Sequence, residues 1–214
     1  MAGSLGDRLL GVVARHRLAA TLWLSLLLAV PAVVVLKHQR PPLPIYARLP
    51  AWELTDQDGH AFGAAQLRGR VWVADFMFTS CPSICPELTR HLGAVQTRTA
   101  SLGDRLHIVS ISVDPVVDTP ARLTEYAHRH GADPARWHFV TGTAPALQHL
   151  AADGFRTALG EVPTSAEGRP ETFNILHSAR VMLIDGEGRM RGVYRTDGEG
   201  MSDLLRDAAR LTGR

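Results

Sequence analysis

Two cysteines are the residues of this sequence whose type and spacing could perform chemistry. Cys81 and Cys85 lie four positions apart in the segment FTSCPSICP, and the 214-residue chain contains no other cysteine. A run of apolar residues, 71–78, predicts a buried strand just before them, and a helical pattern starts at Pro86. Ligands and reactive groups collect at this edge of open α/β sheets. Because a helix N-terminus favours the thiolate, we expect lowered thiol pKa values and cysteines usable as nucleophiles or metal ligands.

The spacing of the pair favours a metal at least as much as a disulfide. In a regular helix, residues i and i+4 hold their Cβ atoms about 5–6 Å apart, whereas a relaxed disulfide needs about 3.5–4.5 Å. Thioredoxin-type redox proteins place two residues between their cysteines, and this chain places three. A distorted first turn would still allow the bond. Two thiolates and an imidazole would form a soft ligand set that suits copper, with Cu(I) favoured by sulfur.

Ten histidines could supply the imidazole, and an ordinary surface or core role is the simplest interpretation for most of them. His128 and His130, for example, lie two positions apart on a predicted helix and cannot face the same metal. His177 differs in its context, because it follows a glycine- and proline-rich stretch, 153–174, and precedes a predicted strand. Loops of that length in compact domains are usually functional or mobile.

Strand and helix patterns alternate along the chain from about residue 50. The buried runs 71–78 and 106–113 flank a predicted helix, 86–100, and together make a strand–helix–strand unit with parallel strands. The other predicted elements are a hairpin over 52–62, a helix over 118–130, strands over 137–140, 180–184 and 190–195, and a helix over 201–211. The sequence therefore predicts an α/β fold, a mixed sheet with helices on both faces.

Two aspartates in the segment SVDPVVDTP have competing interpretations. Asp114 precedes a proline and favours a turn, and Asp118 can cap the helix that follows it. A supporting role beside a metal is the alternative for both residues.

The N-terminal part of the chain predicts a membrane anchor. Residues 18–36, LAATLWLSLLLAVPAVVVL, carry no charge and would span about 28 Å as a helix, which just crosses a bilayer core. No cleavage site of the A-x-A kind follows, which favours a retained anchor. A short tail, 1–17, precedes the anchor, and a proline-rich spacer, 37–50, leads to one domain over 51–214. Basic residues flank the anchor on both sides, so the positive-inside rule gives no orientation.

Composition excludes several classes of protein. The chain is 45% hydrophobic and 21% charged, with no repeat and no long block of one charge, as is typical of a folded globular protein. Lys and Arg number 23 against 21 Asp and Glu, so no basic stripe is available to track nucleic acid. Two cysteines are too few for a disulfide-stapled small domain or for a closed zinc site built from cysteine.

Three motifs in order carry a resemblance to a known family. FTSCPSICP, SVDPVVDTP and ILHSARVMLIDGEG together resemble the Sco/SenC family of membrane-anchored copper proteins, which have a thioredoxin-like fold. The resemblance covers the chain from Trp52 to the C-terminus, and the ordered combination is far more specific than any one motif. Residues 172–176, just before His177, lack the acidic residue often found directly before the histidine in this family. The expected ligand His177 is present, but the acidic side chain that would support it is not.

The resemblance implies that Cys81, Cys85 and His177 bind copper, as Cu(I) or Cu(II), and that the protein helps to assemble the dinuclear copper centre of cytochrome c oxidase. It also implies a domain on the outer side of the bacterial inner membrane, which resolves the orientation. The expected partners are the copper-bearing subunit of the oxidase, a second periplasmic copper chaperone as a candidate donor, and the membrane through residues 18–36. Nucleic acid is not expected as a partner.

Three functions are compatible with the cysteine pair. The leading hypothesis is a copper chaperone rather than an enzyme, in which oxidation of Cys81 and Cys85 to a disulfide blocks metal binding. The alternative is a membrane-tethered thiol–disulfide oxidoreductase that reduces the cysteines of its target and has no need of His177. The two functions can coexist in one protein. A structural disulfide is the third interpretation, and the position of the pair at a strand-to-helix turn disfavours it.

Overall fold

The computed structural model describes residue 27 and residues 41–82, 84–156 and 180–213. Contacts within the chain divide it into two units, Met1–Pro42 and Leu43–Arg214, and the second unit contains the sheet. No helix among the described residues is long and apolar enough to cross a membrane. The predicted anchor, 18–36, lies outside the described residues except for Leu27.

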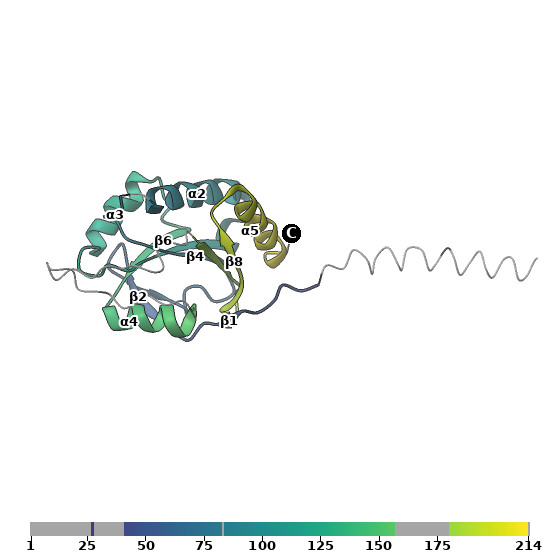
Figure 1. The fold of residues 1–214 in the computed structure, drawn as a ribbon, viewed down its shortest axis with the longest axis horizontal. Coiled ribbons are helices and arrows are strands. Elements are labelled where there is room, and N and C mark those ends of the chain that lie inside the picture. The colour runs from purple at the N-terminus through teal and green to yellow at the C-terminus, as the bar shows by residue number, and fades with distance from the viewer. Residues whose placement is uncertain (1–26, 28–40, 83, 157–179, 214) are drawn as a thin grey trace, which may run out of the picture. The chain divides into compact units, whose positions relative to one another are not determined.

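The described part of the second unit is built on one mixed sheet of eight strands (Figure 1). Along the sheet the strand order is β1-β8-β7-β4-β5-β6-β2-β3. Strands β4, β5 and β6 are parallel to one another, and the remaining pairs are antiparallel. The strands are β1 (Ala47–Arg48), β2 (Glu53–Asp56), β3 (Ala61–Gly63), β4 (Val71–Met77), β5 (Leu106–Ser112), β6 (Trp137–Thr141), β7 (Arg180–Ile184) and β8 (Arg189–Arg195).

Helices cover both faces of the sheet, as the sequence predicts (Figure 1). One face carries α2 (Ile84–Arg98), α3 (Pro120–Arg129) and α5 (Gly198–Leu211). The other carries the short helix α4 (Ala144–His149), which continues into one π-helical turn, η2 (Leu150–Gly154). A 3-10 segment, η1 (Ala100–Arg105), joins α2 to β5.

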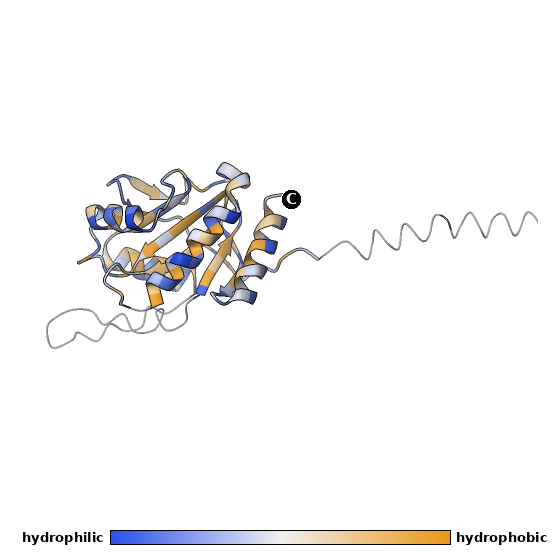
Figure 2. Cartoon of the chain, turned by 90° about the horizontal axis from the view of Figure 1, so that it is seen from above, coloured by the Kyte–Doolittle hydropathy of each residue, from blue (hydrophilic) through white to orange (hydrophobic). Residues whose placement is uncertain are grey.

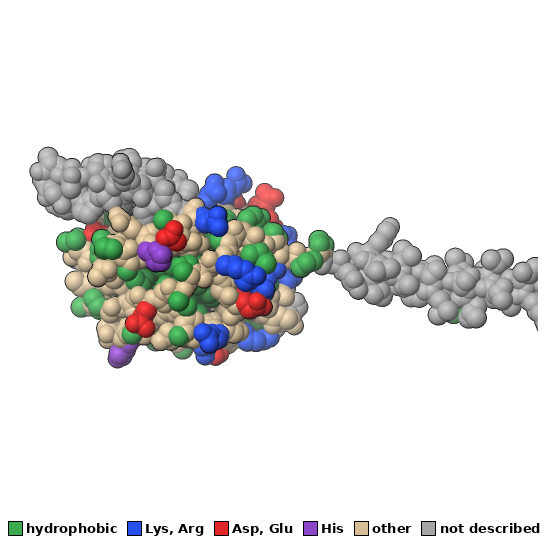
Figure 3. Space-filling model, turned by 90° about the horizontal axis from the view of Figure 1, so that it is seen from below, with side chains coloured by type: hydrophobic (Ala, Val, Ile, Leu, Met, Phe, Trp, Pro, Cys, Tyr) green, Lys and Arg blue, Asp and Glu red, His purple; other side chains and the backbone are tan. Residues whose placement is uncertain are grey.

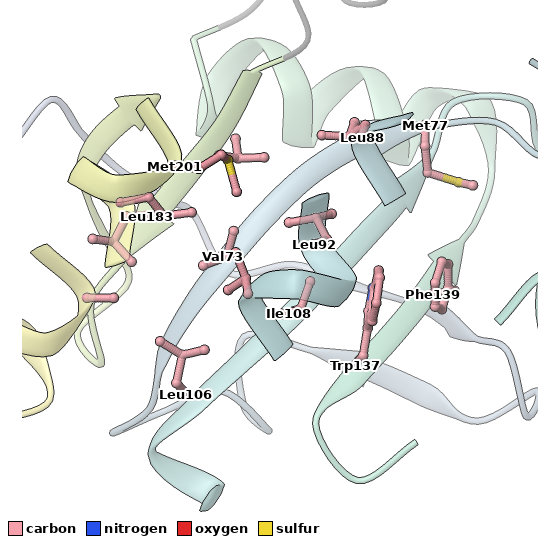
Figure 4. Close-up of a cluster of buried hydrophobic side chains, with 14 of the residues drawn as sticks. Val73, Met77, Leu88, Leu92, Leu106, Ile108, Trp137, Phe139, Leu183 and Met201 are labelled. Atoms are coloured by element: carbon pink, nitrogen blue, oxygen red, sulfur yellow. The ribbon is translucent and has the colours of Figure 1, made fainter. Parts of the chain in front are cut away.

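The central strands are buried along their whole length. Every residue of β4 and of β5 is buried, because helices cover them on two sides. Figure 2 shows these strands as hydrophobic, while the covering helices alternate between hydrophobic and hydrophilic residues. Leu88 and Leu92 of α2 pack in the same core as Val73 and Ile108 of the sheet (Figure 4). Helix α2, and with it the cysteine pair, is therefore held on a well-packed layer.

The second half of the expected spacer packs against the domain. Ala47 is 6% exposed and lies opposite Met190 in the antiparallel pair of β1 with β8. The Arg191 side chain donates a hydrogen bond to the carbonyl oxygen of Pro44 at 3.0 Å. The extended conformation agrees with the proline-rich composition, but an extended chain can also pair with a sheet edge, and residues 46–49 do so.

On the face seen in Figure 3, the basic side chains gather on the right-hand side of the domain, acidic side chains lie both among them and on the left, and hydrophobic side chains are scattered over the face.

Candidate metal centre

The two cysteines lie where β4 ends and α2 begins. The amide of Cys81 donates to the carbonyl oxygen of Phe78 at 3.2 Å, which closes a turn directly after the strand. The Cys81 sulfur in turn accepts a hydrogen bond from the backbone amide of Cys85 at 3.4 Å, so it lies over the first turn of α2. Both cysteines are buried thiols that are not joined in a disulfide, with Cys81 9% exposed and Cys85 1% exposed. The strand-to-helix position predicted for the pair is confirmed.

The expectation of a lowered thiol pKa is wrong for Cys85. Burial raises its pKa well above the ordinary value, and the Cys81 side chain, within hydrogen-bonding reach, raises it further. The backbone at Phe78 lowers it, but by less than burial raises it. The loss of hydration therefore outweighs the helix N-terminus. Cys85 is a neutral thiol at neutral pH, and a metal that binds it must displace its proton.

Asp118 is fully buried, and it does not cap α3. Thr119 occupies the cap position, where its side chain accepts a hydrogen bond from the Arg122 amide. The Asp118 carboxylate instead accepts hydrogen bonds from the amide and hydroxyl of Thr79 and from the Ser112 hydroxyl. The predicted cap is therefore wrong, because two neighbouring residues both have side chains suited to capping and the second one takes the position.

Asp114 has the turn role that the sequence predicts. Its carboxylate accepts a hydrogen bond from the Val117 amide at 3.2 Å, within the loop between β5 and α3. Its backbone amide donates to the Ser112 hydroxyl at 3.1 Å. Asp114 and Asp118 thus meet at one serine, and of the two only Asp118 reaches the turn before Cys81.

His177 lies outside the described residues, as do residues 157–176 of the preceding stretch. The structure therefore brings together two of the three predicted ligands, Cys81 and Cys85, and adds Asp118 next to them through Thr79.

A buried carboxylate outside the three motifs lies under α2. Asp75 is 0% exposed, in the middle of β4, and accepts a hydrogen bond from the Ser110 hydroxyl at 2.6 Å. The Trp137 indole donates to that same hydroxyl at 3.0 Å. The second carboxylate oxygen of Asp75 has no hydrogen-bond partner among the described residues. Burial raises the pKa of Asp75 to about 7. The signal in the sequence is one charged residue inside the apolar run VWVADFM.

A second group of possible metal-binding side chains lies on the β2–β3 hairpin. Ligand atoms of Asp56, Asp58 and His60 lie within 4.8 Å of one another. One carboxylate oxygen of Asp56 already accepts hydrogen bonds from the amides of Asp58 and His60, which accounts for the cluster as turn geometry.

Comparison with protein families identifies the chain. The model of the SCO1/SenC family matches residues 46–212, which is most of the sequence. The chain belongs to the SCO1/SenC family. The match begins at Tyr46 and so includes β1, in agreement with the packing of that strand on β8. The mixed sheet with helices on both faces is that of a thioredoxin-like fold.

Curated members of the SCO1/SenC family are similar over most of their length. The SCO1 protein homolog of Bacillus subtilis is 28% identical over 71% of this chain and 75% of its own. A protein of Stutzerimonas stutzeri, named as a candidate copper-binding protein, is 32% identical over 72% of each chain.

Solved structures of the family share the fold. A SCO1/SenC family lipoprotein from Bacillus anthracis is 31% identical, with a TM-score of 0.68 over 80% of this chain and 98% of its own. ScoI of Bradyrhizobium japonicum, solved with copper bound, is 25% identical, with a TM-score of 0.64 over 77% of this chain and 99% of its own.

Proposed function

We propose that this member of the SCO1/SenC family is a copper chaperone that binds copper through Cys81, Cys85 and His177 and assists assembly of the dinuclear copper centre of cytochrome c oxidase. The observation that carries the proposal is the pair of buried thiols at the start of α2, where the Cys81 sulfur accepts a hydrogen bond from the Cys85 amide. Copper is present in the solved structure of a relative, ScoI of Bradyrhizobium japonicum. Copper is the cargo here, and its coordinating atoms on this chain would be two sulfurs and one imidazole nitrogen.

The chemistry of the described residues suits a metal that is held and then released. Two thiolates form a soft site, and both thiols must lose their protons when the metal binds. Transfer would proceed by exchange of these sulfurs for the thiolates of the recipient. Cys81 is the more exposed of the two, at 9% against 1%, so we expect exchange to begin at Cys81 while Cys85 still holds the metal.

The proposed site would work at a membrane surface. Residues 18–36 would anchor the chain in the bacterial inner membrane with the domain in the periplasm, where the copper-bearing subunit of the oxidase and a donor chaperone would meet it. Asp114 and Asp118 would support the site through the loop that joins β5 to α3. Oxidation of the two cysteines to a disulfide would prevent loading.

A thiol–disulfide oxidoreductase is the alternative. Such an enzyme needs one cysteine that attacks and a second that resolves the mixed disulfide, and because burial raises the pKa of Cys85, the attack would fall to Cys81, the more exposed of the two. A protonated Cys85 suits a ligand that ionises only when the metal arrives.

Copper titration of the full chain in detergent, with the thiols kept reduced, tests the proposal. We expect one copper per chain, lost in Cys81→Ser and in Cys85→Ser. His177→Ala should weaken Cu(II) binding by roughly tenfold or more and change the absorption bands of the metal, with dithiol oxidation largely intact. His128→Ala, at an exposed position of α3, is the matched control and should leave the titration unchanged.

Unchanged copper binding in either cysteine variant would overturn the assignment of the site. Rapid turnover of a disulfide-bonded target peptide without copper would move the assignment to the oxidoreductase.

A further inference from the structure

The buried carboxylate of Asp118 has a set of hydrogen bonds that capping of α3 does not explain. Its Oδ1 accepts from the Thr79 hydroxyl at 2.5 Å, and its Oδ2 accepts from the Thr79 amide at 3.0 Å and the Ser112 hydroxyl at 2.6 Å. Asp118 itself is 0% exposed. A charged group is this deeply buried only where donors compensate for the water it has lost, and three donors do so here.

Two of those three donors belong to one residue of the cysteine turn. Thr79 lies inside the turn that the hydrogen bond from the Cys81 amide to the Phe78 carbonyl closes. With both its amide and its hydroxyl bound to one carboxylate, the residue cannot rotate without breaking charge-assisted bonds. The backbone just before Cys81 is therefore held in place by Asp118, a residue of the loop between β5 and α3.

The residues that hold Asp118 belong to well-ordered elements. Ser112 is the last residue of β5, a fully buried strand, and Asp118 directly precedes the capped N-terminus of α3. The exposed Arg122 of α3 donates from its Nε to the Thr79 hydroxyl at 3.0 Å. The hydroxyl therefore lies between a guanidinium and a carboxylate, which leaves it one orientation.

We propose that Asp118, acting through Thr79, is the positioning residue that holds Cys81 at its distance from Cys85 and keeps the pair in the dithiol form that binds metal. The inference rests on the proposed function only for the identity of the metal. A disulfide would replace the hydrogen bond from the Cys85 amide to the Cys81 sulfur by a bond between the two sulfurs, with the Cβ atoms about 3.8 Å apart, and we infer that the Cys81 turn shifts when it forms. The hydrogen bonds between Asp118 and Thr79 oppose that shift. The motif SVDPVVDTP thus acts on the cysteines without touching a sulfur.

The experiment measures the dithiol–disulfide equilibrium of the full chain in detergent, in redox buffers of glutathione, with free thiols counted by alkylation. We expect Asp118→Asn and Thr79→Val to shift the equilibrium toward the disulfide by roughly three- to tenfold, because the first removes the charge that strengthens these hydrogen bonds and the second removes the bond from the hydroxyl. Thr79→Ser keeps the hydroxyl and should restore the wild-type equilibrium. The controls are Asp133→Asn, whose carboxylate caps the Ala135 amide in another loop, and Thr124→Val, whose hydroxyl binds carbonyl oxygens of Gln57 and Pro120. Both controls should behave as the wild type does.

A second measurement separates positioning from folding. The copper-loaded Asp118→Asn and Thr79→Val variants should both show shifted sulfur-to-copper absorption bands, and Thr79→Ser should show the wild-type bands. If Asp118→Asn fails to fold, Thr79→Val carries the test, because it replaces a hydroxyl with a methyl group of similar size and removes no charge. Wild-type equilibrium in a folded Thr79→Val variant, or failure of Thr79→Ser to restore it, overturns the proposal. Absence of copper binding by the wild type would overturn the proposed function alone, since the thiol equilibrium is measured without metal.

Discussion

Asp75 shows how one buried charge affects stability near the site. The residue lies in the middle of β4, 0% exposed, on the strand that leads to the cysteine turn. Folding raises its pKa from 3.8 to about 7, because burial removes the water that stabilises the carboxylate, and the Ser110 hydrogen bond offsets only part of that effect. The folded state therefore holds this proton more tightly than the unfolded state does. Stability falls as pH rises from about 4 to about 7, and the full cost is present above the folded-state pKa.

We predict that Asp75→Asn stabilises the protein at pH 8. The pKa difference, from 3.8 to about 7, corresponds to at most about 4 kcal/mol, and asparagine keeps the size and the acceptor for Ser110 without the charge. A gain of about 2–4 kcal/mol in the free energy of unfolding is expected, measured by urea denaturation. Ser202→Ala, on the exposed part of α5, serves as a control for the procedure and should change stability little. A loss of stability in Asp75→Asn at pH 8 would contradict the argument.

The chemistry of single residues was predictable from the sequence only where a motif names them. Cys81 and Cys85 are the two cysteines of the chain and stand at a strand-to-helix junction, so type and place both point to them. The raised pKa of Cys85 was not predictable, because it depends on how deeply α2 buries its first turn. Asp118 was found, but its partner Thr79 lies 39 positions away, and no local pattern connects two such residues.

At the scale of elements, residues 43–49, which precede the β2–β3 hairpin, lie along the edge of the sheet and are called the strap below. Arg191, 9% exposed, donates to the carbonyl oxygens of Leu43 and Pro44 and pairs with the buried Asp185 at 2.7 Å. Asp185 keeps its charge, because hydrogen bonds from Arg191 and Arg189 help to hold its pKa below the ordinary value despite burial. The strap, residues 43–49, is thus held by a buried ion pair as well as by the ladder to β8.

We predict that Arg191→Met releases the strap and leaves the sheet folded. Amide hydrogen exchange at Tyr46 and Leu49, which donate to Met190 and Gly188, should lose its protection, whereas the amides of β4 should keep theirs. A stability loss of about 3–5 kcal/mol is expected, since the change leaves Asp185 buried with one cation fewer. Arg48→Met, on the exposed side of β1, is the control. Retained protection at Tyr46 in Arg191→Met would show that the ladder alone holds the strap.

Elements were predictable where the apolar pattern is strong. Strands β4 and β5 are apolar on both faces, and their parallel pairing followed from the helix between them. Helix α4 was missed because it has six residues, too few for a helical period, although Thr143 caps it and a proline stands in its first turn. Strand β1 was missed because it has two residues, and its place depends on β8 and on Arg191, far along the chain.

At the scale of the whole molecule, the buried Asp75 and the partly buried His138 titrate with opposite effects on stability in the same pH range. The His138 ring stacks on Phe62 at 4.3 Å between ring centroids and lies parallel to His107 at 5.6 Å. Burial, followed by the neighbouring His107, lowers the pKa of His138 from 6.5 to about 4. The unfolded state therefore binds this proton more readily, and the contribution to stability, full above pH 6.5, is lost as the pH falls toward 4. Asp75, on the opposite face of the sheet, gains stability over the same descent.

We predict that the titrations of Asp75 and His138 offset each other in the wild type. Replacing one of the two residues should therefore reveal how the other makes the free energy of unfolding depend on pH. In Asp75→Asn, the free energy of unfolding should fall by about 1–2 kcal/mol between pH 7 and pH 4.5, because His138 then acts without opposition and is partly exposed. In His138→Phe, which keeps a ring on Phe62, it should rise by about 1–3 kcal/mol over the same interval. The double variant should lose the contributions of both Asp75 and His138, which lie on different faces of the sheet and should add, and should keep that of His107, whose pKa burial also lowers. Slopes of the same sign in both single variants, measured by urea denaturation at each pH, would mean that other groups govern acid stability and that Asp75 and His138 do not.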